Sequence, residues 1–365
     1  MELLLDFFLQ KKMIFLLTFN ILVGIFIVFL WKKYATKFIG IESSEVQRIH
    51  KSKTHIPRMG GFLFLFGLIF LYLVNLGNSI WFTDQLDSIL LLMILCNLPL
   101  FIISLREDIK FDASPLLRLC GILVSSFLFL FFQPFGLPLI DIPYINNFIN
   151  LPVISMILFI IAQTGYCNGM NLIDGANGLA GMVILSTLLS IGIVSFIVSD
   201  LIIFYIVIVL IGYIIIFLLF NYPWGAIFLG DSGAYLWGSI ISSLTIMLYA
   251  KNNIPTWGAA VILFYPSMEM IFSFFRKKIQ NKSPLEPDPD HLHLKLYFYL
   301  ERRTKNFKKS NLLIMPILSL VWLTPLVLIP WVFNSINMIS ISLTVLIFIY
   351  FILYILFPKR KINQI

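Results

Sequence analysis

The sequence predicts an all-α, polytopic integral membrane protein, and three observations support this fold class. Hydrophobic residues make up 59% of the 365 residues, the mean hydropathy is +0.95 and only 12% of residues are charged, whereas soluble domains carry about 25%. Many continuous apolar runs reach the ~20 residues that a helix needs to cross a bilayer. Because these runs do not alternate between polar and apolar residues, a membrane β-barrel is disfavoured.

Hydropathy predicts about eleven spanning helices in one membrane-embedded domain over residues 1–365. The first run is too long for a signal peptide and lacks a small-residue cleavage site, so we expect an uncleaved helix. We expect Cys96, Cys120 and Cys167 to be small buried hydrophobes, because they lie in or beside apolar runs without metal-ligand spacing. The predicted spans are 13–31, 60–76, 88–105, 116–133, 153–168, 177–198, 201–220, 227–249, 257–275, 312–332 and 338–357.

The distribution of basic residues predicts the orientation. Of the 26 Lys and Arg residues, all but Lys11, Lys12 and Lys251 lie on one side in this arrangement of spans. By the positive-inside rule that side faces the cytoplasm. We therefore expect a multi-pass protein of the cytoplasmic (inner) membrane, with the N-terminus outside and the C-terminus in the cytoplasm. The net charge of +8 is then explained by attraction of the basic loops to anionic lipid head groups rather than by nucleic-acid binding. The candidate active-site loops on this side are 32–59, 106–115, 168–177, 221–231 and 276–311.

The stretch NGMNLIDGANGLAG, residues 168–181, is a polar island between two apolar runs. Such an island is costly in a membrane protein unless it faces water or a ligand. Its glycines permit tight turns and close approach to a bound group, and Asp174 is an oxygen donor of the kind that Mg²⁺ prefers. A simple polar loop between two helices is the alternative.

Two further acidic motifs lie on the same predicted side. Glu107 and Asp108 follow the third span in SLREDIKFD, and such a pair can share a metal or a proton. Asp231, framed by Gly230 and Gly233, lies near the start of a spanning helix. Asp231 either caps that helix or provides a metal-binding carboxylate. A solvated acidic loop is the alternative for the Glu107–Asp108 pair.

The histidines and nearby cations suit an anionic ligand. RIHKSKTHIPRMGG contains His50 and Arg58 before a Gly-Gly turn, although an ordinary basic loop has the same composition. His291 and His293 form an H-x-H pair in PDPDHLHLKL, which permits a Zn²⁺ site, phosphate contacts or a solvated surface pair. Glu269, within the ninth predicted span, is expected to face the bundle interior and to pair with Arg276 or another cation.

Together these motifs resemble the polyprenyl-phosphate N-acetylhexosamine-1-phosphate transferase superfamily, from about Arg48 to Lys295 and in the family's order. The acidic pair is Glu-Asp where many members have Asp-Asp, and Leu294 stands where some members have a third histidine. Both departures are more similar to the branch that initiates O-antigen and capsule than to the peptidoglycan branch. The matching positions, beyond the acidic pair and the basic N-terminal motif, are Asn168, Asn171, Asp174, Gly175, Gly178, Leu179, Gly230, Asp231, Gly233, Asp288, His291 and His293.

The resemblance implies transfer of a sugar 1-phosphate from a UDP-N-acetylamino sugar to undecaprenyl phosphate, with release of UMP and initiation of O-antigen, capsule or teichoic acid linkage synthesis. The implied cofactor is Mg²⁺, with Mn²⁺ as an alternative, and a homodimer is left open. Asp231 is expected to be the principal metal ligand, with Glu107 and Asp174 sharing the site, and Asp108 to bind, position or deprotonate the lipid phosphate. Substrate contacts are expected from His50, Arg58, Asn168, Asn171, Arg276, His291 and His293.

Two hypotheses from other classes compete with the transferase. A transporter or flippase for an anionic lipid or sugar places ionisable groups near the middle of the membrane in broken helices, often with repeated halves. Here the acidic residues cluster at one face, and only Glu269 is clearly within a span. A structural scaffold does not account for five polar motifs on one side.

Overall fold

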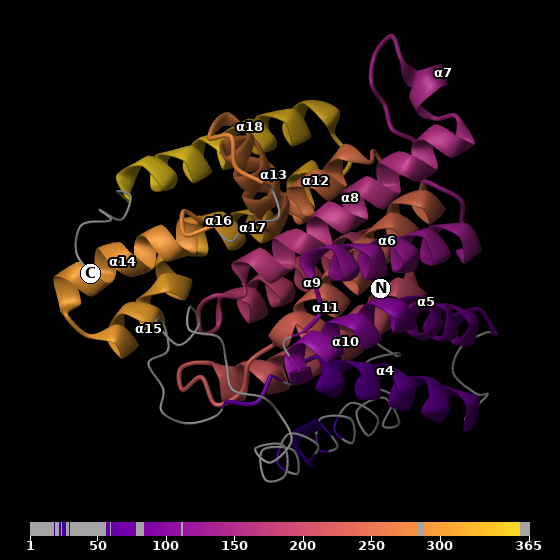
Figure 1. Ribbon diagram of the computed structural model, residues 1–365. Helices are drawn as coiled ribbons and strands as arrows, with labels where there is room; N and C mark the ends of the chain where they lie inside the picture. Colours follow the sequence, from indigo (N-terminus) through magenta and orange to yellow (C-terminus); the bar gives the residue numbers. More distant parts are fainter. Residues whose placement is uncertain are drawn as a thin grey trace.

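The computed structural model describes residues 56–58, 60–77, 84–110, 112–283 and 288–357, together with Thr18, Leu22, residues 24–26 and Phe29. Within these residues the secondary structure is helical apart from one isolated β-bridge between Arg58 and Phe228, which confirms the all-α prediction (Figure 1). The helices are α4 (Gly60–Gly77), α5 (Asp84–Lys110), α6 (Pro115–Phe132), α7 (Asn146–Ile149), α8 (Pro152–Ile173), α9 (Leu179–Ile197), α10 (Leu201–Asn221), α11 (Gly230–Asn252), α12 (Trp257–Ile262), α13 (Phe264–Ile279), α14 (Leu292–Thr304), α15 (Phe307–Ile317), α16 (Ser319–Trp322), α17 (Thr324–Val332) and α18 (Ile336–Leu356).

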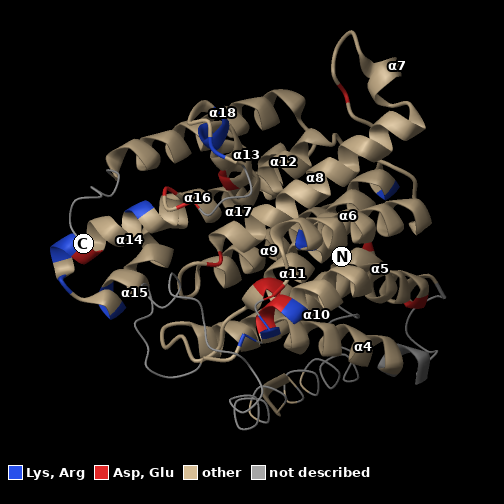
Figure 2. Ribbon diagram, in the orientation of Figure 1, with Lys and Arg blue, Asp and Glu red and all other residues tan. Residues whose placement is uncertain are grey.

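Eight helical stretches among the described residues are long and apolar enough to cross a membrane, and each coincides with a predicted span. Charged side chains are sparse along the middles of these helices and lie mainly near their ends (Figure 2). The apolar part of α4 is shorter, and the predicted span 13–31 lies almost wholly outside the described residues. A polytopic helical membrane protein is therefore confirmed, whereas the count of eleven and the orientation stay predictions.

The predicted span 257–275 is not one continuous helix. It is divided into α12 and α13 at Leu263, and neither part is among the eight candidate spans. Pro266 explains the break, because it has no N–H to donate to the carbonyl of Ile262 and is tolerated only in the first turn of a new helix. The carbonyl of Pro266 packs against Gly169 of α8, where a Cβ atom would collide with it.

Helix α11 lies at the centre of the bundle and packs against α4, α5, α6, α8 and α9. Of the residues in its most apolar stretch, 94% are buried. Small residues permit this packing: a Cβ atom on Gly61 of α4 would lie 2.8 Å from the backbone nitrogen of Gly233, and one on Gly238 would lie 2.8 Å from the Cα atom of Cys167. Trp237 stacks on Phe64 with ring centroids 3.6 Å apart. The start of α11 is thus held firmly in place.

The cysteine prediction is correct at two positions and wrong at the third. Cys96 and Cys167 are buried, whereas Cys120 is exposed. Cys120 lies on α6, a helix that is only partly covered by its neighbours and carries exposed apolar side chains such as Phe131. A thiol on such a face is compatible with lipid contact, because burial by protein is not required of an apolar residue in a membrane helix.

Candidate functional site

Asp231 lies in the first turn of the central helix α11, at the end of the bundle where α5 and α8 finish. The preceding residue, Gly230, has a φ of +74°, and a Cβ atom there would lie 2.8 Å from a carboxylate oxygen of Asp108. Both constraints favour glycine. The Asp231 side chain is 16% exposed, so the turn presents a carboxylate at a helix N-terminus that remains accessible.

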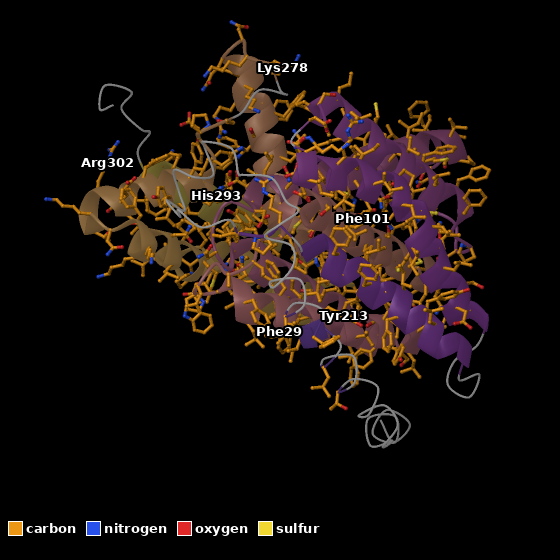
Figure 3. All side chains as sticks on the ribbon, turned by 60° about the horizontal axis from the view of Figure 1, so that its bottom comes forward. Phe29, Phe101, Tyr213, Lys278, His293 and Arg302 are labelled. Carbon is orange, nitrogen blue, oxygen red and sulfur yellow. The ribbon has the colours of Figure 1, made fainter. Side chains whose placement is uncertain are left out.

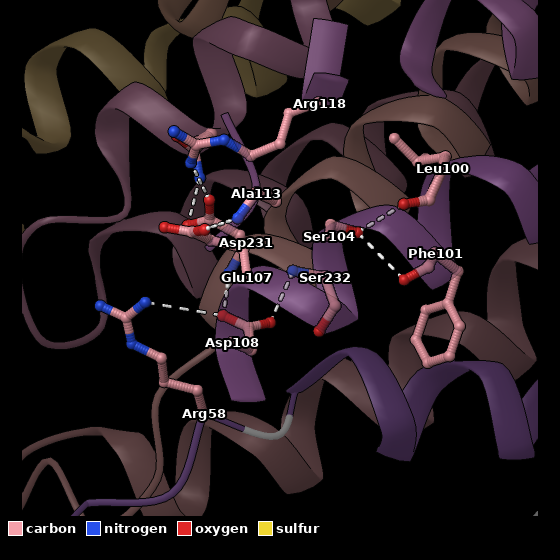
Figure 4. Close-up of polar contacts among 11 residues, drawn as sticks. Arg58, Leu100, Phe101, Ser104, Glu107, Asp108, Ala113, Arg118, Asp231 and Ser232 are labelled. Atoms are coloured by element: carbon pink, nitrogen blue, oxygen red, sulfur yellow. Dashed lines mark hydrogen bonds and ion pairs between the residues drawn. The ribbon is translucent and has the colours of Figure 1, made fainter. Parts of the chain in front are cut away.

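Asp108, at the end of α5, caps α11 from a different helix (Figure 4). Its Oδ1 atom accepts a hydrogen bond of 2.9 Å from the backbone N–H of Asp231, and its Oδ2 atom accepts one of 2.8 Å from Ser232. A guanidinium nitrogen of Arg58 lies 3.6 Å from Oδ1, and the Asp108 side chain is only 1% exposed. Asp108 therefore satisfies two free N–H groups of the helix terminus and fixes the register of α11 against α5.

Two side chains from other helices hold the Asp231 carboxylate. Arg118, in the first part of α6, forms an ion pair with its Oδ2 atom (Figure 4). The amide of Asn171 on α8 donates a hydrogen bond of 3.1 Å to Oδ1. Within the described residues nothing accepts a hydrogen bond from the buried Nε atom of Arg118. Arg118 is a site residue that the sequence analysis counted only as a basic charge.

Glu107 lies beside this cluster rather than within it. Its Oε2 atom accepts a hydrogen bond of 2.9 Å from the backbone N–H of Ala113, which closes the turn between α5 and α6. Both Glu107 and Asp231 interact electrostatically with Arg118. The predicted acidic pair thus divides its tasks: Asp108 is directed inward to α11, and Glu107 is directed to the loop.

The loop after α8 brings the polar island to the same end. Asp174 follows the last residue of α8, one turn beyond Asn171, whereas the amide of Asn168 donates to the carbonyl of Thr164 in its own helix at 2.9 Å. The turn at Asn177 and Gly178 is held by side chains from other helices. The backbone N–H of Asn177 donates to Asn311 at 2.9 Å, and that of Gly178 donates to Asn221 at 2.6 Å.

The histidine motif is buried rather than solvated, which excludes the interpretation of a surface pair. His291 and His293 stack with ring centroids 6.0 Å apart, and their exposed fractions are 4% and 2%. His293 lies among the helices, whereas Lys278 and Arg302 project from the surface (Figure 3). Burial, together with the neighbouring His291, lowers the pKa of His293 to about 4. Its ring packs against Gly175, so the histidine motif and the polar island meet.

The pairing of Glu269 with Arg276 is not observed. Glu269 contacts His291 at 3.0 Å, and Arg276 pairs with Asp288 and donates to the hydroxyl of Tyr354 at 3.0 Å. Seven residues along a helix correspond to about 10 Å, too far for a direct contact between Glu269 and Arg276. Burial opposes ionisation of Asp288, but hydrogen bonds from Asp290 and Ser273, among others, lower its pKa to about 2. Arg276 is thus committed to holding the loop.

The residues at the start of α11 fit a divalent cation such as Mg²⁺. This ion usually binds one or two carboxylates and completes its shell with water and substrate phosphates. Asp231 meets this requirement, because its carboxylate is accessible and is held in place by Asn171 and Arg118. The described residues contain no group of three His, Cys, Asp or Glu side chains arranged around one point. Sharing of an ion by Asp231, Asp174 and Glu107 therefore stays a prediction.

The structure brings Arg58, Asp108, Asn171 and Asp231 into one connected cluster. The histidine pair lies in a second cluster, with Glu269, and Gly175 of the polar island joins it. His50 lies outside the described residues.

The fold and the site define a class: a multi-pass helical membrane protein with a carboxylate at the N-terminus of a buried central helix. Residues 89–249, which include α8 and most of α5 and α11, match the family model described as Glycosyl transferase family 4. This match supports the superfamily that the motifs of the chain resemble.

Curated relatives support the same superfamily. The phospho-N-acetylmuramoyl-pentapeptide-transferase of Staphylococcus carnosus is 27% identical over 258 residues, covering 68% of this chain and 78% of the relative. The protein of the same name from Streptococcus pneumoniae is 25% identical over 287 residues, covering 77% and 85%. That from Staphylococcus aureus strain JH9 is 26% identical over 263 residues, covering 69% and 80%.

Proposed function

We propose that the protein transfers a sugar 1-phosphate from a UDP-N-acetylamino sugar to undecaprenyl phosphate at the cytoplasmic face of the inner membrane. The observation that carries this proposal is the convergence of three motifs on one carboxylate: Asp108 fixes the helix that bears Asp231, while Asn171 holds its side chain. The names of the relatives, which are phosphosugar transferases, support the same reaction class.

In the proposed reaction, a phosphate oxygen of undecaprenyl phosphate attacks the β-phosphorus of the UDP-sugar. A new P–O bond joins the two phosphates, and the bond from the β-phosphorus to the bridging oxygen breaks. UMP leaves with that oxygen and its electron pair. The second pKa of a phosphate monoester is about 6, so the nucleophile is largely ionised at neutral pH. A strong base is therefore not required, which agrees with the burial of Asp108 against two N–H groups.

The chain's own residues contribute positioning and charge. Asp231 would hold Mg²⁺, or Mn²⁺ in its place, and the bound ion would neutralise the phosphate oxygens. Arg118, whose side chain is 20% exposed beside Asp231, would bind a phosphate oxygen through the outer nitrogens of its guanidinium, which offers donors in a fixed fork. Asn171 orients Asp231, and Asp108 keeps α11 in register. Phosphoryl transfer depends mainly on such positioning and electrostatic stabilisation.

The decisive experiment measures UMP release by purified protein with Mg²⁺, undecaprenyl phosphate and a panel of UDP-sugars. The panel contains UDP-N-acetylglucosamine, UDP-N-acetylgalactosamine, deoxy and diamino sugars, and UDP-N-acetylmuramoyl-pentapeptide. We expect UMP release with at least one N-acetylhexosamine donor. Such a result agrees with a role in starting O-antigen, capsule or teichoic acid linkage synthesis. Release with the pentapeptide donor alone would instead assign the chain to peptidoglycan synthesis.

A folded sample that releases no UMP with any donor would favour a transporter or flippase. The broken helix α12–α13 is a feature that such proteins share. The polar clusters lie at helix ends, however, and a transport pathway needs groups along the membrane interior. Transbilayer movement of undecaprenyl phosphate in proteoliposomes would measure that alternative directly.

A further inference from the structure

Glu269 is a deeply buried acidic side chain that the proposed chemistry does not use. It lies on α13 and is 1% exposed. Its Oε2 atom is 3.0 Å from Nδ1 of His291, and its Oε1 atom accepts a hydrogen bond of 3.1 Å from the backbone N–H of Leu292. Both oxygens are therefore directed at the histidine motif, which lies more than twenty positions further along the chain.

The contact with Leu292 fixes how the carboxylate faces the imidazole. A buried charged group is expensive unless it is paired and hydrogen-bonded, and the two N–H donors stabilise the ionised form of Glu269. An ionised carboxylate only accepts hydrogen bonds. The Nδ1 atom of His291 must therefore carry a proton, and in the neutral ring the Nε2 atom is then an acceptor.

We propose that Glu269 is a positioning residue that fixes the orientation and the protonated nitrogen of His291. This inference rests on the proposed function and on the expectation from the sequence that His291 contacts the substrate. Glu269 does not itself touch substrate in this scheme. Its role parallels that of other carboxylates that hold a histidine ring by its second nitrogen, where the tautomer decides what the outward nitrogen can do.

Glu269→Gln gives a sharp test, because Leu292 determines how the new amide lies. The Leu292 N–H requires the amide oxygen, so the amide NH₂ group faces Nδ1 of His291. That nitrogen must then accept, and the proton moves to Nε2. We expect the value of kcat/KM for UMP release to fall about 100-fold, the usual consequence of a misplaced catalytic contact. Glu269→Asp, which keeps the charge, should recover part of this loss.

A double-mutant cycle separates positioning from simple destabilisation. His291→Asn keeps a donor for Glu269 but removes Nε2. We expect Glu269→Gln and His291→Asn to divide their losses between kcat and KM in the same proportion. In the His291→Asn background, Glu269→Gln should cost less than about twofold more, because coupled residues are not additive. Losses that multiply would overturn the proposal. Glu301→Gln, the same substitution on the partly exposed surface of α14, is the matched control.

Nitrogen NMR of ¹⁵N-histidine-labelled protein tests the same claim without turnover. The chain has four histidines, and the His291→Asn spectrum assigns the relevant ring. At alkaline pH we expect the His291 proton on Nδ1 in the wild type and on Nε2 in Glu269→Gln. The same tautomer in both proteins would overturn the inference. A wild type that releases no UMP but shows this change would refute the proposed function while leaving the positioning by Glu269 supported.

Discussion

Two ends of the bundle contain buried acids, and these acids are used differently. At the end opposite the candidate site, Asp200 caps α10, and it accepts hydrogen bonds of 2.9 Å from Lys251 and 3.1 Å from Asn252. Its side chain is 1% exposed, whereas that of Asp231 is 16% exposed. The group beside Asp231, Arg118, keeps a buried donor without an acceptor in the described residues. A fully buried and closed polar cluster agrees with a structural role, whereas an accessible carboxylate beside a cation agrees with ligand binding.

Asp108 belongs to the structural type although it lies at the candidate site. Like Asp200 it is 1% exposed and caps a helix with both oxygens engaged. Both oxygens of Asp231 are also engaged, so the comparison separates the predicted catalytic carboxylates by the exposure of their side chains rather than by their motif. Three aspartate substitutions test this separation, and Gly175→Ala tests the contact between the two clusters; they follow in order of their expected effect on turnover.

Asp231→Asn should have the largest effect. The amide keeps the size of the side chain and can still contact Arg118, but it loses the charge that would hold Mg²⁺. We expect UMP release to fall about 10³-fold, the scale for removing a principal electrostatic group, with little change in the unfolding temperature. Asp112→Asn, in an exposed ion pair with Arg106, is the control and should be near normal. Turnover within a few-fold of wild type would remove Asp231 from the metal site.

Asp108→Asn should reduce both turnover and stability. An amide offers one acceptor oxygen, so one of the N–H groups of Asp231 and Ser232 loses its partner. We expect a loss of about 1–3 kcal/mol in unfolding free energy and a roughly 100-fold fall in turnover from misalignment of α11. Denaturant unfolding in detergent, run beside the activity assay, measures both. Lost activity with unchanged stability would instead give Asp108 a direct chemical role.

Gly175→Ala should have an intermediate effect by disturbing the contact between the two clusters. A Cβ atom would lie 2.9 Å from Cδ2 of His293, and overpacking of this kind costs about 1–3 kcal/mol. We also expect displacement of the His293 ring to lower turnover about tenfold, which corresponds to a rise of about 1.4 kcal/mol in the activation barrier. If the clash with the ring is the cause, His293→Ala should relieve the loss of thermal stability. A double variant as unstable as the sum of the singles would place the clash elsewhere.

The sequence predicted the helices and the end to which each motif belongs, because apolar length fixes the spans and their alternation fixes the sides. Asn171 and Asp231 come from two motifs that were predicted at the same end, and they are in contact, although this particular contact was not predicted. The partners within that end were less predictable. The cap that Asp108 provides joins residues 123 positions apart, and the pair of Arg118 with Asp231 depends on how α6 is rotated about its axis. Neither contact can be predicted from local periodicity, although the presence of Arg118 in the first turns of α6 was a visible signal of a cation near this end of the bundle.

The smallest effect on turnover should come from Asp200→Asn, the counterpart of Asp108→Asn at the opposite end. The amide NH₂ group would face Lys251 or Asn252, both donors, so the cluster would lose an acceptor. We expect a fall of about 1–3 kcal/mol in unfolding free energy but UMP release per folded molecule within about twofold of wild type. Lys251 is one of three basic residues outside the predicted cytoplasmic side, and its pairing with Asp200 neutralises that charge locally. A large loss of turnover in a folded variant would show that closure of a polar cluster does not distinguish structural from functional acids in this bundle.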